Sequence, residues 1–269
     1  MTNELADHFL SLHQPGVPLV MPNPWDRGSA VLFASLGFKA LATTSSGFAA
    51  TLGRLDGGVD RDEAIAHAAE IVSATDLPVS GDLENGFGDG PEDAATTVSL
   101  AIGAGLAGCS IEDYGPEAGV YDLGLATERV AAAAEAAHGP ERLVLTARAE
   151  NLIRGVDDLD DTIARLLAYQ DAGADVLFAP GLGSAEDVRR VVEAVDRPVN
   201  VLARPGLPSI AGLAELGVAR VSVGGSLAFA GWGAVATAAR ELLDDGTYGY
   251  WDTTKVGIHE VRAAFGRPS

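Results

Sequence analysis

The stretch Leu77-Pro78-Val79-Ser80-Gly81-Asp82-Leu83-Glu84-Asn85-Gly86-Phe87-Gly88 runs from a short apolar segment into two acids and a glycine loop. An alanine-rich segment with helical spacing follows at residues 91–104, and Gly105 comes where a left-handed helix cap is expected. A second apolar run lies at residues 108–113. A strand, a helix and another strand in this order predict two parallel strands in one sheet.

The same pattern recurs along the whole chain. Short apolar runs that we expect to form strands lie at residues 18–21, 40–43, 77–82, 108–113, 143–148, 176–179, 198–203 and 220–224. Segments with helical spacing lie at residues 60–73, 91–104, 127–137, 159–172, 185–195 and 227–243. This α/β pattern predicts a (β/α)8 TIM-type barrel. An open doubly wound sheet is the alternative, but Pro-Asn-Pro-Trp-Asp at residues 22–26 replaces the glycine fingerprint expected after its first strand.

We find no linker or low-complexity tract that divides the chain. We therefore expect one barrel domain over residues 1–269, with a helical tail at about residues 244–269. The tail carries Tyr248, Tyr250, Trp251 and Phe265, and aromatic side chains are usually buried against a partner. We expect that partner to be another subunit, which predicts a homo-oligomer, specifically a tetramer.

The composition excludes several classes of function. The formal net charge is −20, which leaves no basic stripe for nucleic acid or an anionic membrane. No run of about eighteen apolar residues and no signal-peptide pattern is present, so we expect a cytoplasmic protein. Cys109 is the single cysteine, which excludes internal disulfides and cysteine-rich zinc sites.

Acidic residues gather where the expected strands end. Asp82 and Glu84 lie two residues apart, so on an extended strand they share one face and repel each other unless a cation lies between them. Glu112 and Asp113 end the next strand-like run. Carboxylates from neighbouring strand ends suit a hard divalent cation, with Mg²⁺ as the first choice and Mn²⁺ as an alternative.

Other polar residues at strand ends suit a small anionic substrate. The guanidinium of Arg148 is suited to grip a carboxylate or phosphonate, although pairing with Glu150 or Glu112 is an open alternative. Ser45, Ser46 and Gly47 offer hydroxyl and backbone N–H groups to a second anionic end, unless they form an ordinary connection. Asn200 is a further candidate for substrate binding. No lysine or histidine falls at an expected strand end, which disfavours Schiff-base and imidazole chemistry.

The chain resembles the isocitrate lyase/phosphoenolpyruvate mutase superfamily. The motifs that carry the resemblance lie at residues 22–26, 45–47, 53–56, 82–88, 110–113 and 146–150. The resemblance implies a barrel whose last helix is exchanged between subunits. It also implies Mg²⁺ at Asp82, directly or through water, with Glu84, Glu112 and Asp56 holding its waters.

By the same resemblance, Arg148 binds the substrate and the turn at residues 45–47 receives its carboxylate or phosphonate. The implied reaction is cleavage of a C–C bond in a small 2-oxo or 2-hydroxy acid through a metal-stabilised enolate. C–P bond chemistry, as in a phosphonomutase or phosphonopyruvate hydrolase, and a non-catalytic metabolite-binding barrel are the alternatives.

The loop at residues 114–122 departs from the family. It lacks the lysine-cysteine-glycine-histidine signature of the lyases, whose cysteine is the general acid, and the lysine and asparagine of the mutases. Tyr121, Tyr114 and Asp122 are the candidates in this loop for a replacement acid.

Overall fold

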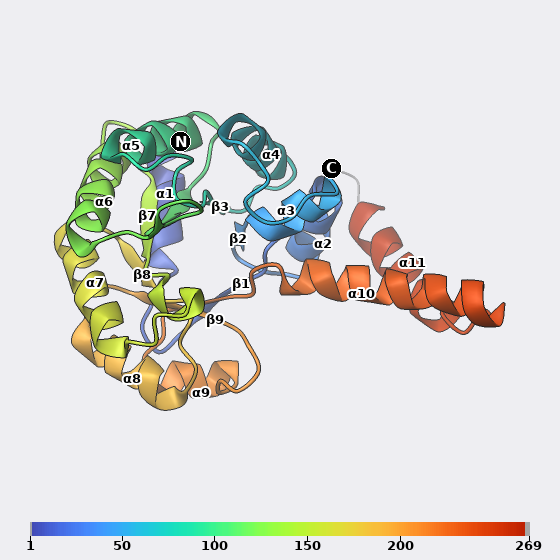
Figure 1. Ribbon diagram of the computed structural model, residues 1–269. Coiled ribbons are helices and arrows are strands. Elements are labelled where there is room, and N and C mark those ends of the chain that lie inside the picture. The colour runs from blue at the N-terminus through green and yellow to red at the C-terminus, as the bar shows by residue number, and fades with distance from the viewer. Residues whose placement is uncertain (1, 267–269) are drawn as a thin grey trace.

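Eight parallel strands form the centre of the molecule in the computed structural model, which describes residues 2–266 (Figure 1). Their order in the sheet is β1-β10-β9-β8-β7-β4-β3-β2. The strands are β1 (Leu19–Met21), β2 (Leu41–Ala42), β3 (Val79–Asp82), β4 (Gly108–Glu112), β7 (Val144–Arg148), β8 (Val176–Phe178), β9 (Val199–Leu202) and β10 (Arg220–Ser222). Each of the eight expected apolar runs contains one of them.

The two outer strands of this order, β1 and β2, meet and nearly close the barrel. The amide of Ala42 donates a hydrogen bond to the carbonyl of Pro22 at 3.1 Å. The side chain of Asn23 donates to the carbonyl of Thr43 and accepts from the amide of Gly224, so it ties the ends of three strands together. The (β/α)8 prediction is confirmed.

Helices surround the sheet as the sequence pattern predicts. They are α1 (Thr2–Ser11), α2 (Arg27–Ser35), α3 (Ser45–Thr51), α4 (Arg61–Ser73), α5 (Pro91–Gly103), α6 (Leu123–Ala137), α7 (Leu159–Asp171), α8 (Ala185–Ala194), α9 (Ile210–Glu215), α10 (Ser226–Arg240) and α11 (Trp251–Phe265), with short helical turns η1 (Asn151–Arg154) and η2 (Glu241–Asp245). Asp60 and Glu63 form the capping box expected at the start of α4. Gly105 follows α5 with a φ of +83°, which is the left-handed conformation expected of a helix cap.

Helices α2, α3 and α9 lie outside the segments that were predicted to be helical. Two further local features were also not predicted from the sequence. Helix α1 lies across the N-terminal opening of the barrel, where Ala6 and Phe9 pack with Leu19, Met21 and Val144 in a small core of their own. The loop after β4 forms a hairpin of β5 (Tyr114–Gly115) and β6 (Gly119–Val120). Helix α1 therefore covers the N-terminal end of the barrel, and the C-terminal ends of the strands form the open end.

Helices α10 and α11 extend away from the barrel as a two-helix arm (Figure 1). Helix α11 returns along this arm and packs against α2. Apolar side chains on the arm are exposed within this chain, including Phe229 at 51%, Trp232 at 49% and Val235 at 61%. Burial of such side chains is favourable, so the arm is suited to contact another surface.

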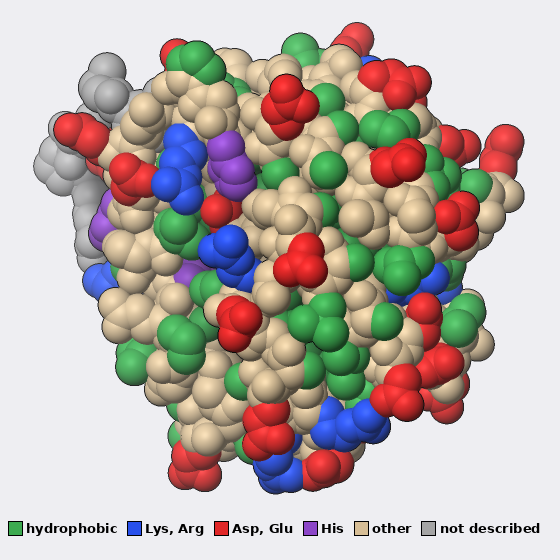
Figure 2. Space-filling view, turned by 90° about the vertical axis from the view of Figure 1, so that its left-hand side faces the viewer, with side chains coloured by type: hydrophobic (Ala, Val, Ile, Leu, Met, Phe, Trp, Pro, Cys, Tyr) green, Lys and Arg blue, Asp and Glu red, His purple; other side chains and the backbone are tan. Residues whose placement is uncertain are grey.

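On the outer face that carries α6 and α7, acidic and basic side chains are scattered between apolar ones (Figure 2). Among the described residues, no helix is both long and apolar enough to cross a membrane.

Candidate active site

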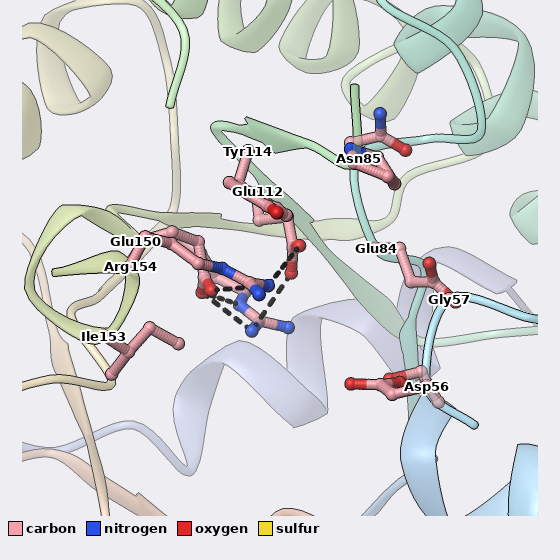
Figure 3. A pocket seen from close by; sticks show the side chains of 12 residues that line it. Asp56, Gly57, Glu84, Asn85, Glu112, Tyr114, Glu150, Ile153 and Arg154 are labelled. Carbon is pink, nitrogen blue, oxygen red and sulfur yellow. Dashed lines mark hydrogen bonds and ion pairs between the residues drawn. The ribbon is translucent and has the colours of Figure 1, made fainter. Parts of the chain in front are cut away.

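Two adjoining cavities open at the C-terminal ends of the strands. The larger has a volume of about 360 Å³ and is shown in Figure 3. The smaller, of about 150 Å³, extends further into the barrel. Both are lined by Ser45, Asp56, Arg148 and Ile153, so they form one continuous candidate site. This is the end of a (β/α)8 barrel at which active sites lie.

Arg148, the last residue of β7, is at the centre of an ion-pair network. Its Nη1 lies 2.8 Å from Oδ1 of Asp82, and its Nη2 lies 3.0 Å from Oε2 of Glu112 and 2.7 Å from Oε1 of Glu150. The register of the sheet explains the meeting, because Arg148 pairs directly with Glu112 on β4. The sequence left open whether Arg148 binds a substrate or pairs with Glu112 and Glu150. In this structure it pairs with both acids.

Burial and charge act together on this network. Burial disfavours the charge of Arg148, but Glu112, Glu150 and Asp82 raise its pKa well above its ordinary value. Burial also raises the pKa of Glu112 well above its usual range, with Glu150 and Asp82 adding to the effect against Arg148. Three carboxylates share one guanidinium, and Glu112 consequently holds a proton more tightly than an exposed glutamate does.

Asp82 connects this network to the expected serine turn. Its Oδ2 accepts a hydrogen bond from the amide of Ser45 at 3.0 Å. The turn is the first part of α3, capped by Thr44, whose hydroxyl accepts from the amide of Gly47 at 3.3 Å. A Cβ at Gly47 would approach Cγ2 of Thr44 to 2.6 Å, so only glycine fits without a shift of its neighbours. Ser45 and Ser46 line the deeper cavity, whereas Gly47 does not line it and packs against Thr44, Trp25 and Ala228.

Glu84 and Asp56 face the larger cavity from the side opposite Glu112, Glu150 and Arg154 (Figure 3). Glu84 has a φ of +49°, which is unusual for a residue with a side chain. Burial, followed by the charges of Asp82 and Asp56, raises the pKa of Glu84 to about 7. The acids on this side thus repel one another, and the charges of Arg148 and Arg154 offset only part of this effect on Glu84.

The donor set fits a hard divalent cation that keeps part of its water shell. Among residues 2–266, no three acidic, histidine or cysteine side chains converge closely enough to form a complete metal site. The groups that face the cavity from this side are carboxylates, and the mutual repulsion of Glu84, Asp82 and Asp56 is of the kind that a cation relieves. Mg²⁺ commonly binds through one or two carboxylates and several waters.

Three residues of the loop at 114–122 were candidates for a general acid, and only one of them lines a cavity of the site. Tyr114 lines the larger cavity. The hydroxyl of Tyr121 donates to Oδ1 of Asp89 at 2.5 Å and accepts from the side-chain amide of Asn85 at 2.9 Å, and Tyr121 lines neither cavity. Asp122 caps α6 through the amide of Leu125.

Asn200 also lies outside the cavity walls. It is fully buried in the barrel, and its side-chain amide donates to the hydroxyl of Ser222, which does line the deeper cavity. Of the expected site residues, the structure brings Asp56, Asp82, Glu84, Glu112, Arg148, Ser45 and Ser46 to the cavities.

Arg154 is a cavity residue that the sequence reasoning missed. Its Nη2 lies 3.5 Å from Glu112 and 3.4 Å from Glu150, and its guanidinium lies 3.7 Å from the centre of the Tyr114 ring. It lies on η1, six residues beyond Arg148, and no motif or spacing distinguishes it in the sequence. Asp113, by contrast, is buried and binds Arg165 and Tyr169 behind the site.

Comparisons with known proteins agree with this architecture. The family model described as phosphoenolpyruvate phosphomutase matches residues 9–243. An uncharacterised protein of Mycobacterium tuberculosis is 39% identical over 238 residues, which are 88% of this chain and 89% of the relative. The 2-methylisocitrate lyase of Halalkalibacterium halodurans is 30% identical over 235 residues, which are 85% of this chain and 74% of that enzyme.

Solved structures extend the likeness to three dimensions. A Burkholderia cenocepacia protein, described in general terms as a lyase or mutase, is 50% identical with a TM-score of 0.89, and the match covers 93% of this chain and 91% of that one. 2,3-Dimethylmalate lyase is 30% identical with a TM-score of 0.81, and the match covers 91% of this chain and 89% of that enzyme. This chain belongs to the phosphoenolpyruvate mutase/isocitrate lyase superfamily.

Proposed function

We propose that this protein is a Mg²⁺-dependent lyase that cleaves a C–C bond in a small 2-oxo or 2-hydroxy carboxylate, with Mn²⁺ as a substitute ion. The observation that carries the proposal is the cavity itself, in which Asp56, Glu84 and Glu112 surround the space next to Arg148. The names of two relatives support the substrate class, because 2-methylisocitrate and 2,3-dimethylmalate are both branched 2-hydroxy acids with more than one carboxylate.

Asp82, Glu84, Glu112 and Asp56 would hold the metal ion, directly or through its waters. When bound there, such an ion would supply positive charge to stabilise negative charge that develops on a substrate oxygen. Arg148 holds Asp82 and Glu112 in place through its two terminal nitrogens. The hydroxyl groups of Ser45 and Ser46, on the wall of the deeper cavity, are placed to receive a carboxylate of the substrate.

A lyase also needs a proton donor for the carbanion that leaves. We assign this role to the Oη of Tyr114, because it is the candidate of its loop that lines the cavity. The ring of Tyr114 is held against the guanidinium of Arg154, which is anchored in turn by Glu112 and Glu150. Removal of a positioned acid typically slows a reaction about 10²- to 10⁴-fold.

The match to the phosphoenolpyruvate phosphomutase family makes C–P chemistry the second candidate. A panel of 2-methylisocitrate, 2,3-dimethylmalate, oxaloacetate and phosphonopyruvate with Mg²⁺ distinguishes the two. Release of pyruvate or another 2-oxo acid from a hydroxy acid supports the lyase, and conversion of phosphonopyruvate alone supports the C–P enzyme.

The matched control for this panel is Asp82→Ala, which removes the contacts to Arg148 and Ser45 and should abolish turnover. Thermal stabilisation by these acids without turnover of any of them would contradict the proposal and favour a binding barrel.

A further inference from the structure

Arg220 is a buried arginine in the interior of the barrel. It begins β10, and its exposed fraction is 3%. Ser222 lies two residues further along the same strand, so both side chains point to the same face. Both line the deeper cavity, in which Ser222 is closer to the strand end and Arg220 is further down the barrel.

The partners of Arg220 are neutral. Its Nη1 donates to the hydroxyl of Thr146 at 3.1 Å and lies 3.4 Å from Nε2 of His13. Nδ1 of His13 lies 2.9 Å from the carbonyl of Phe9 and donates to it, which leaves Nε2 as the acceptor. Burial and the nearby Arg220 lower the pKa of His13 to about 3, so the ring is uncharged at neutral pH.

Within residues 2–266, Arg220 forms no ion pair with a carboxylate, and its buried Nε has no hydrogen-bond partner. The charged group that acts on it is Arg148, which repels it. The acids of the neighbouring network pair with Arg148 and Arg154, and none of them forms an ion pair with Arg220. An arginine remains charged in proteins, and a buried charge without a counter-ion is strongly unfavourable.

The walls around this guanidinium are suited to hold a compact anion. Ser80, Ser110 and Ser222 line the same cavity and offer hydroxyl donors. Helix α1 and its small apolar core cover the N-terminal opening below. An occupant therefore enters from the strand ends, where the candidate active site lies.

We propose that Arg220 forms the floor of a carboxylate-binding site inside the barrel, below the ion-pair network of Arg148. The carboxylate belongs either to the substrate, whose distal end would reach down the barrel axis, or to a free small acid such as formate. The proposal does not depend on the reaction assigned above, because the site is defined by an uncompensated charge and a cavity.

The test is thermal and urea unfolding of the full chain with increasing sodium formate, in EDTA and without added metal. Formate at ten times its Kd should raise the folding equilibrium constant of the wild type about elevenfold. Arg220→Met should lose this effect, and without formate it should be at least as stable as the wild type. Arg197→Met, which removes an exposed arginine, should respond to formate like the wild type.

Arg220→Lys keeps a positive charge and should retain a weakened formate response, which provides a second variant if Arg220→Met does not fold. Equal stabilisation of the wild type and Arg220→Met by formate would overturn the proposal. A titration with oxalate in the absence and presence of saturating formate distinguishes the two sources. Weaker oxalate binding with formate supports the substrate's carboxylate, and unchanged oxalate binding supports a separate small-acid site.

Discussion

Replacement of Glu84 by glutamine should stabilise the metal-free protein, and only at neutral and alkaline pH. Burial and the charges of Asp82 and Asp56 raise the pKa of Glu84 to about 7 from an ordinary value of 4.5. Glu84 therefore holds its proton more tightly in the folded than in the unfolded protein. This difference stabilises the folded state fully below pH 4.5, and the stabilisation is lost as the pH rises through 7. Glutamine mimics the protonated carboxyl and avoids this loss.

The pKa difference of Glu84 corresponds to about 3 kcal/mol of unfolding free energy. Because Glu84 is only half-buried, solvent screens its interactions with the neighbouring charges, and this value is an upper limit. The expected difference between Glu84→Gln and the wild type is near zero at pH 4.5 and reaches its plateau above pH 7. Added Mg²⁺ should shrink it, because a cation stabilises the charged form of Glu84 in the wild type.

Urea unfolding in EDTA from pH 4.5 to 8.5 measures this difference. Glu135→Gln is a matched control, since Glu135 is exposed on α6 and should show no such pH dependence. If Glu84→Gln were no more stable than the wild type at pH 8, the mutual repulsion of the acids at this cavity would be refuted.

Three further predictions concern the acid, the serine turn and the arm. Tyr114→Phe should lower kcat about 10²- to 10⁴-fold with little change in stability. Tyr121→Phe leaves the buried side-chain amide of Asn85 without its acceptor and should lower the unfolding free energy by about 1–3 kcal/mol. Steady-state kinetics and urea unfolding of both variants separate the two roles. Gly47→Ala should destabilise the protein by about 1–3 kcal/mol in urea unfolding, because the new Cβ would clash with Thr44, and an unchanged midpoint would contradict the tight packing at this turn. We expect light scattering to give the mass of a tetramer, with the arm exchanged between subunits; Trp232→Asp should lower that mass, and a monomeric wild type would show that the arm stays with its own chain.

Much of the barrel could be predicted because the sequence signals for its strands and helices each lie within a few neighbouring residues. Apolar runs, alanine-rich helical segments and cap residues such as Asp60 and Gly105 each specify an element within a few residues. The strand ends were predicted for the same reason, and with them the positions of Asp82, Glu84 and Glu112. The family resemblance drawn from the motifs at these strand ends is confirmed by the family model, which matches residues 9–243.

The positions of individual side chains at the site were harder to predict from the sequence. Tyr114 and Tyr121 belong to the same short loop, and the hairpin of β5 and β6 decides that one lines the cavity while the other binds Asp89. Asn200 lies on the expected strand but does not line either cavity, and its side-chain amide donates to Ser222, which lines the deeper one. Arg154 reaches the cavity from η1, the helical turn that follows β7.

By itself, the sequence determined the order of strands and helices, the barrel that they form, and the end of the barrel at which acids accumulate. Only the tertiary structure decided which charges meet. Arg148 contacts acids from β3 and β4 because the register aligns these strand ends, while Arg220, on β10, forms no ion pair with any acid in the described part of the chain, residues 2–266. Secondary structure depends on neighbours in the chain, whereas the balance of buried charge depends on residues that closure of the barrel brings together from distant segments.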